Sequence, residues 1–158
     1  MSESSAPEPG LLAGDAVADV WDHVNIYDGG ETFLRDIAAI AEPKRHLVVA
    51  FWCDWEVVNG GFQQLFWNST GVVVPEAPAA YRALGLDLAA GLFDAALFHF
   101  PQPYPRDCMT RRRMFTLLPG ENYPSSGQFE RLDKAYYDLF PGREFGRAAD
   151  VYAIRNII

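Results

Sequence analysis

The sequence predicts an all-α fold, an irregular compact bundle of roughly seven or eight short helices around a buried central helix. Apolar residues recur at helical spacing in most segments, and no segment shows a convincing period of two. Glycine and proline residues end these segments after a few turns. Because 49% of the 158 residues are hydrophobic, the chain has ample apolar side chains for one core in one domain.

The first helix is expected to begin at Asp15, whose carboxylate is placed to cap it. Residues 1–14 precede it as a flexible tail, because Ser, Glu, Pro and Gly dominate the start of the chain. The single helical domain then covers residues 15–158. The buried stripe of the first helix is predicted to consist of Val17, Val20, Trp21, Val24 and Tyr27. Residues 31–41 repeat the helical period and should pack beside this helix.

Residues 44–58 are predicted to form the central helix. Their apolar run is unbroken over 47–53, so periodicity alone does not separate a buried helix from a buried strand. About fifteen residues exceed a usual strand, and a helix that is apolar on nearly all sides belongs at the centre of a domain. Asn59 or one of the two glycines after it is expected to close this helix. A short helix over 62–68 and a turn at 68–71 should follow.

Five further helices are predicted in the second half of the chain, at residues 76–84, 86–100, 108–118, 125–139 and 145–158. Gly85 and the pair Pro141-Gly142 are placed to end two of them. Three prolines between 101 and 105 force a loop between two others. Ser125 and Gln128 have the spacing of a capping box.

The formal net charge of −8 opposes direct nucleic-acid binding, because that affinity comes from Lys and Arg side chains that neutralise phosphates. Residues 1–100 carry 14 acidic and 4 basic residues, a net −10, whereas residues 101–158 carry a net +2. The electrostatic field of such a charge distribution favours association with a basic surface. With no export signal and no apolar run of about 18 residues, the chain is expected to be cytoplasmic and away from the membrane. Cys53 and Cys108 are accordingly expected to be free thiols.

No catalytic constellation is recognisable in the sequence. Asp54 and Glu56 are two residues apart, a spacing that points them to different sides of a helix, and Glu56 is expected to bond the turn after the glycines. No cofactor is predicted, and no metal site, because the three histidines lie in different segments without ligand spacing. A ligand pocket formed by Glu56, Gln63, Gln64 and Asn68 is an alternative, although amides beside a turn commonly satisfy backbone groups.

The run Arg111-Arg112-Arg113 is the sharpest basic cluster of the chain. Three adjacent arginines fan around a helix, so they do not present one cationic face. We expect at least one of them to pair with the acidic N-terminal region rather than bind an external anion.

Acidic residues of the N-terminal half form the candidate partner-binding face. The face is predicted to consist of Asp15, Asp19, Asp22, Asp28, Glu31 and Asp36. The first three fall at positions i, i+4 and i+7 of one predicted helix, which places one carboxylate about every 5 Å. A DNA strand presents one phosphate about every 3.4 Å, so such a row could imitate the edge of a DNA backbone. The alternative interpretation is a solvated helix face.

Residues 56–71 resemble the signature of a bacterial domain-of-unknown-function family that is named after a DNA-mimic protein. The matching motif residues are Glu56, Asn59, Gly60, Gly61, Phe62, Gln64, Asn68 and Gly71. Residues 81–85 and 132–137 resemble weaker motifs of the same family, so the resemblance covers about residues 15–158. It implies an all-helical fold and an acidic dimer that binds a transcription factor in place of DNA. The motif itself predicts a role in the fold, because mimicry depends on surface carboxylates that the motif does not specify.

Charge and resemblance together predict a noncatalytic acidic binding protein whose partner is a basic protein, such as a DNA-binding transcriptional regulator. An immunity-type role, in which the chain inhibits a basic toxin, belongs to the same physical class. Two alternatives come from other classes. One is a small-molecule-binding domain or enzyme with a pocket near Glu56, Gln64 and Asn68, and the other is a helical scaffold without an activity of its own.

Overall fold

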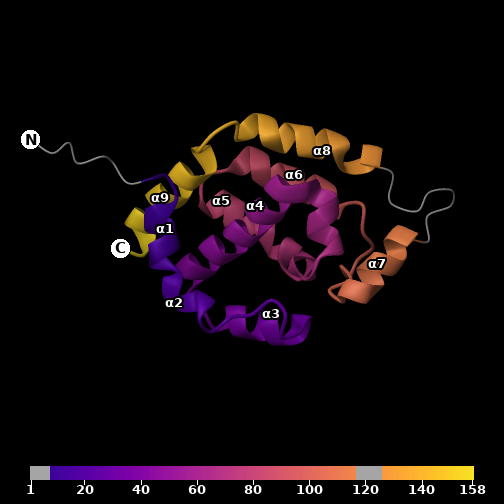
Figure 1. Ribbon diagram of the computed structural model, residues 1–158, viewed down its shortest axis with the longest axis horizontal. Coiled ribbons are helices and arrows are strands. Elements are labelled where there is room, and N and C mark those ends of the chain that lie inside the picture. The colour runs from indigo at the N-terminus through magenta and orange to yellow at the C-terminus, as the bar shows by residue number, and fades with distance from the viewer. Residues whose placement is uncertain (1–7, 117–125) are drawn as a thin grey trace, which may run out of the picture.

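Helices are the only regular elements in the residues that the computed structural model describes, which are 8–116 and 126–158 (Figure 1). The all-α prediction is confirmed. The elements are α1 (Leu11–Ala16), α2 (Ala18–Trp21), α3 (Gly30–Ala38), α4 (Glu42–Trp67), the 3-10 helix η1 (Ser69–Glu76), α5 (Ala77–Ala83), α6 (Asp87–Leu97), α7 (Cys108–Thr116), α8 (Ser126–Leu139) and α9 (Glu144–Asn156). None of these described helices combines the length and the apolar character that crossing a membrane requires.

The predicted central helix is α4, which runs through the middle of the molecule (Figure 1). It begins at Glu42, and Pro43 occupies its first turn, where an N–H would have no partner within the helix. The elements η1, α5, α7, α8 and α9 all contact it. Leu47, Val48 and Cys53 are fully buried, so the unbroken apolar run reflects neighbours on nearly every side of the helix.

The glycine pair divides α4 as predicted. Gly60 (φ −156°, ψ 21°) and Gly61 (φ 75°, ψ −179°) leave helical geometry, and a short helical segment then continues to Trp67. Asp133 of α8 accepts a hydrogen bond from the Phe62 N–H at 2.8 Å, which caps this second segment. A Cβ at Gly61 would lie 2.6 Å from an Asp133 oxygen. Glycine therefore serves both the positive φ and the approach of the capping carboxylate.

The prediction of one first helix extending to Tyr27 is wrong. Two short helices, α1 and α2, are separated at Val17 (φ −117°, ψ 9°), and turns follow α2. The bend keeps Val17, Val20 and Val24 buried but leaves Trp21 and Tyr27 at the surface, where Tyr27 is 81% exposed. Helical spacing could not reveal this bend, because both geometries bury the three valines.

The start of the first helix also differs from the prediction. Helix α1 begins at Leu11, so residues 11–14, which were expected in the flexible tail, include the first turn of a packed helix. The N–H groups of Gly10 and Ala13 donate to the Asp150 carboxylate of α9 at 2.7 and 2.9 Å. This carboxylate, remote in sequence, takes the capping role that was expected of Asp15. It also explains why α1 and α9 lie side by side (Figure 1).

The helices of the second half agree closely with the predictions. Helices α5 to α8 lie within their predicted ranges, and α9 begins one residue before its predicted start. Gly85 follows α5 with a φ of 76°, as expected of a residue that ends a helix. The 3-10 helix η1 replaces the simple turn that was predicted at 68–71. The predicted capping box of Ser125 and Gln128 falls outside the described side chains.

Candidate partner-binding cleft

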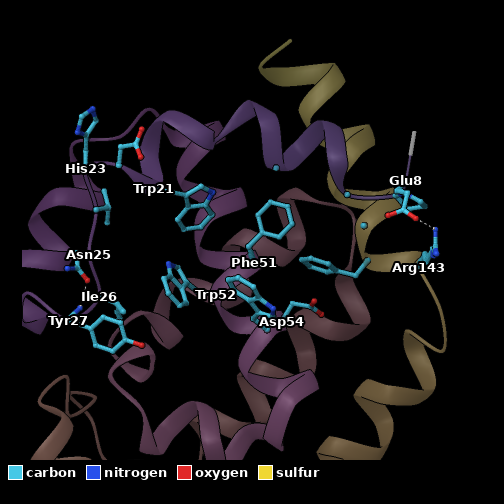
Figure 2. A pocket seen from close by; sticks show the side chains of 18 of the residues that line it. Glu8, Trp21, His23, Asn25, Ile26, Tyr27, Phe51, Trp52, Asp54 and Arg143 are labelled. Carbon is cyan, nitrogen blue, oxygen red and sulfur yellow. Dashed lines mark hydrogen bonds and ion pairs between the residues drawn. The ribbon is translucent and has the colours of Figure 1, made fainter. Parts of the chain in front are cut away.

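A cleft of about 1120 Å³ lies between the N-terminal segment and the middle of α4 (Figure 2). Its walls come from Trp21 and the segment that follows α2, from α4 at 51–55, and from the α8–α9 turn together with the first residues of α9. Residues 8–10 close one end of it. The bend at Val17 separates α1 from α2, and α2 leads into the segment that forms the first of these walls. We call it the aromatic cleft.

Tryptophan and tyrosine rings form the lining of the aromatic cleft. Trp21 and Trp52 meet edge to face with centroids 5.9 Å apart, and Trp52 lies 6.1 Å from Trp55. The Nε1–H of Trp52 is buried and has no hydrogen-bond partner among the described residues. Trp55 is 69% exposed, and Tyr27, on the other wall, is more exposed still. Large exposed aromatic side chains around a cleft are typical of binding surfaces.

Asp54 of α4 places a carboxylate in the wall of the aromatic cleft (Figure 2). The hydroxyl of Tyr136 donates to Asp54 Oδ1 at 2.6 Å, and the Tyr81 hydroxyl lies 2.7 Å from that of Tyr136. Burial raises the pKa of Asp54 from its ordinary 3.8 to about 6, and the hydrogen bond from Tyr136 opposes part of this shift. A carboxylate held in this way in a cleft is a candidate functional group.

The rim of the aromatic cleft carries further acidic groups. Asp22 and Asp28 lie on the segment after α2, and the Asn25 amide donates to Asp28 at 3.2 Å. At the other end of the cleft, Arg143 is 3.5 Å from Glu8, so this cation already has an anionic partner (Figure 2). The described lining is therefore negative when its carboxylates are ionised.

Asp15, Asp19 and Asp22 do not share one helix, so the predicted row with one carboxylate about every 5 Å is wrong. The six residues of the predicted acidic face are Asp15 on α1, Asp19 on α2, Asp22 and Asp28 on the following segment, and Glu31 and Asp36 on α3. Asp19 accepts from Lys44 Nζ at 2.8 Å, and this hydrogen bond holds the pKa of Asp19 below its ordinary 3.8. Asp36 is 3.1 Å from Arg35. Only Asp22 and Asp28 line the aromatic cleft.

The wall of the cleft that α4 provides was not predicted from the sequence. Trp52 and Trp55 are three residues apart and so lie on one side of a helix, but both were read as part of a core helix. Asp54 was weighed only as a partner for Glu56. The sequence does contain a signal for this wall, which is a carboxylate flanked by tryptophans. That pattern indicates a binding site only if this side of α4 is left uncovered by the other helices, and the sequence does not show which side that is.

Glu56 bonds the turn after the glycine hinge, as expected. Its carboxylate accepts from Gln64 Nε2 at 2.8 Å, from Asn68 Nδ2 at 3.0 Å and from Thr70 Oγ1 at 2.7 Å. These bonds join the two segments of α4 to η1. A Cβ at Gly60 would lie 2.1 Å from Gln64 Oε1, so the glycine leaves room for the folded glutamine side chain. We interpret these motif residues as structural groups.

A smaller cavity of about 590 Å³ lies beside the glycine hinge. It is lined by Asn59, Gly60, Gln63, Gln64, Trp67 and Asn68. Glu56 is not among these residues, and the amides of Gln64 and Asn68 both donate to Glu56. Two of the amides in the proposed alternative pocket are therefore already engaged within the chain.

Two arginines of the α7 cluster close the end of α4, because Arg111 and Arg112 donate to backbone carbonyls there and not to the described acidic side chains of the N-terminal region. Arg111 is fully buried, and its guanidinium donates to the carbonyls of Phe66 at 2.9 Å and Asn68 at 2.8 Å. It also donates to two carbonyls of the loop before α7. Arg112 donates to the Trp67 carbonyl at 2.9 Å. Cations at these carbonyls complement the negative end of the helix dipole.

Comparison with known proteins gives one family. A family model described as DMP19-like protein matches residues 38–156. The match includes α4 to α9 and the whole motif at 56–71, but it begins after the six residues of the predicted acidic face. No curated protein and no solved structure matches the chain significantly.

Proposed function

Because this chain belongs to the DMP19-like protein family, we propose that it is a noncatalytic acidic protein that binds a basic protein, such as a DNA-binding regulator. The family name refers to a DNA mimic. For this chain, the proposal places the contact on the acidic face between Asp15 and Asp36, which precedes the region that the family model matches. The location we propose is the cytoplasm, where its two cysteines would stay reduced.

Uncompensated carboxylates on the N-terminal half carry the proposal. Asp15, Asp22 and Glu31 are exposed, and no cation pairs with any of them within 8–116 and 126–158. They extend from α1 to the start of α3, so the negative charge covers a surface rather than one helix face. Charges of this kind steer a basic partner and speed its association.

The test is affinity capture from the native lysate at low and at high salt. We expect basic proteins to be retained at low salt and lost as ionic strength rises, because salt screens exposed charges. The triple variant Asp15→Asn, Asp22→Asn, Glu31→Gln should lose the same proteins at low salt. Retention of partners that is unchanged by both salt and this variant would refute the proposal.

A matched control removes the same number of charges elsewhere. Asp87→Asn, Glu130→Gln and Asp138→Asn neutralise three exposed carboxylates on α6 and α8. The net charge of this control equals that of the triple variant. If position matters and not only total charge, the control should capture the same proteins as the unmodified chain.

A further inference from the structure

We propose that the aromatic cleft receives an arginine side chain of the basic protein partner, an inference that rests on the function proposed above. The acidic face would then attract the partner, and the cleft would select one of its side chains. Rings and carboxylates that belong to different elements converge on this space, and Figure 2 shows them around it.

The lining suits a guanidinium group. Arginine is planar and weakly hydrated, so it stacks on tryptophan and tyrosine faces while its N–H groups bind carboxylates in a fork geometry. Trp55 and Tyr27 offer exposed rings, and Asp54 offers a carboxylate in the same wall as Trp55. Tyr136 donates to Oδ1 of Asp54, and no described donor bonds its Oδ2.

The charges of the cleft favour a cation over other ligands. Asp22, Asp28 and Asp54 face it, whereas Arg143 is already paired with Glu8. A nucleic-acid base could stack on the same rings, but its phosphates would meet these carboxylates. A purely apolar segment would bury the Asp54 charge with the Tyr136 hydrogen bond but no countercharge, which is costly.

The dimensions of the cleft fit a side chain together with its adjoining main chain. Pockets for small ligands typically have volumes of about 300–1,000 Å³, and the aromatic cleft reaches about 1120 Å³. It is also open to solvent between residues 21–28 and α4, so a segment of a folded protein can reach it. A free amino acid would leave much of the space filled with water.

The experiment uses the full chain and two peptides, acetyl-Gly-Arg-Gly-amide and its citrulline counterpart. Citrulline has nearly the same shape as arginine but no charge. Binding is followed by the ¹⁵N–¹H signals of the four tryptophan indoles, three of which line the cleft. We expect saturable shifts of Trp21, Trp52 and Trp55, with the Trp67 signal unmoved, and citrulline binding at least about tenfold weaker.

Variants of exposed residues avoid the risk of unfolding. Trp55→Ala and Tyr27→Ala should each lower the affinity for the arginine peptide about fivefold, because each removes one stacking face. The melting temperature of each variant should stay unchanged. Equal binding of the citrulline peptide would overturn the inference, as would shifts of Trp67 alone. Full affinity of the Trp55→Ala, Tyr27→Ala double variant would overturn it as well.

The capture experiment separates failure of this inference from failure of the proposed function. If salt-sensitive capture persists in the Trp55→Ala, Tyr27→Ala double variant with undiminished retention, the acidic face acts without the cleft and the inference is wrong. If the arginine peptide binds in the cleft but no basic protein is captured, the proposed function is wrong. The arginine would then not come from a protein partner, which also overturns the inference as stated.

Discussion

Replacing Asp54 by asparagine should stabilise the protein at neutral pH. The pKa of Asp54 is raised from 3.8 to about 6, because burial in the cleft wall disfavours its charged form. The difference of about two pKa units corresponds to up to about 3 kcal/mol of unfolding free energy that the ionised carboxylate costs. Asparagine keeps an acceptor for the Tyr136 hydroxyl and carries no charge, so the variant should recover most of this energy.

The sign of the pH dependence follows from the direction of the shift. The folded chain binds the Asp54 proton more tightly than the unfolded chain does, so the contribution of Asp54 to stability falls as pH rises from about 4 to about 6. Above that range the contribution is constant. The stability difference between Asp54→Asn and the unmodified chain should therefore be near zero at pH 4 and largest at pH 7 to 8.

Urea unfolding at several pH values from 4 to 8 measures this difference, and thermal unfolding should show a rise of about 6–12 °C at pH 7.5. Asp22→Asn is the matched control, because it makes the same chemical change on an exposed residue of the same cleft, and it should shift stability by less than about 0.5 kcal/mol. If the free energies of unfolding of Asp54→Asn and the unmodified chain differ by the same amount at pH 4 and at pH 8, the raised pKa of Asp54 is refuted as the cause.

Three substitutions test the interior contacts by the free energy of unfolding. Arg111→Met should lower it by at least about 3 kcal/mol, because four carbonyls each lose the hydrogen bond from the guanidinium, and an unchanged value would show that water replaces it. Gly61→Ala should cost at least about 2 kcal/mol through its positive φ and the nearby Asp133 carboxylate, whereas Gly14→Ala, which meets no neighbour, should be neutral or slightly stabilising. Glu56→Gln should cost about 2 kcal/mol, since an amide cannot accept all three hydrogen bonds, and a loss of ligand binding without a loss of stability would contradict its structural role.

Much of the helical architecture could be predicted because its causes are local. The length of the segment around the apolar run at 47–53 and the glycines after Asn59 predicted a central helix that closes at the glycines, and both features are found. Helices α5 to α8 were placed by the same logic of period and breakers. The resemblance carried by residues 56–71 is confirmed by the family match.

The N-terminal region shows where local signals are insufficient. Val17, Val20 and Val24 are spaced for one helix, and they are equally buried by two short helices joined by a bend. Asp150, which lies far along the chain, holds the first turn of α1 through two backbone N–H groups, so the start of the first helix is also fixed by a distant residue. The spacing of apolar residues within either segment does not reveal a contact between residues so far apart in the sequence.

The sequence by itself determined the helical class, the central helix with its glycine hinge, the family and the excess of acid in the first hundred residues, because these depend on composition and on near neighbours. Only the tertiary structure decided what the acidic residues and tryptophans face. In the folded chain Asp19 pairs with Lys44, and Arg111 donates to backbone carbonyls. Asp22, Asp28 and Asp54 line one cleft. Partners and exposed faces depend on how helices pack, and that packing is a property of the whole chain.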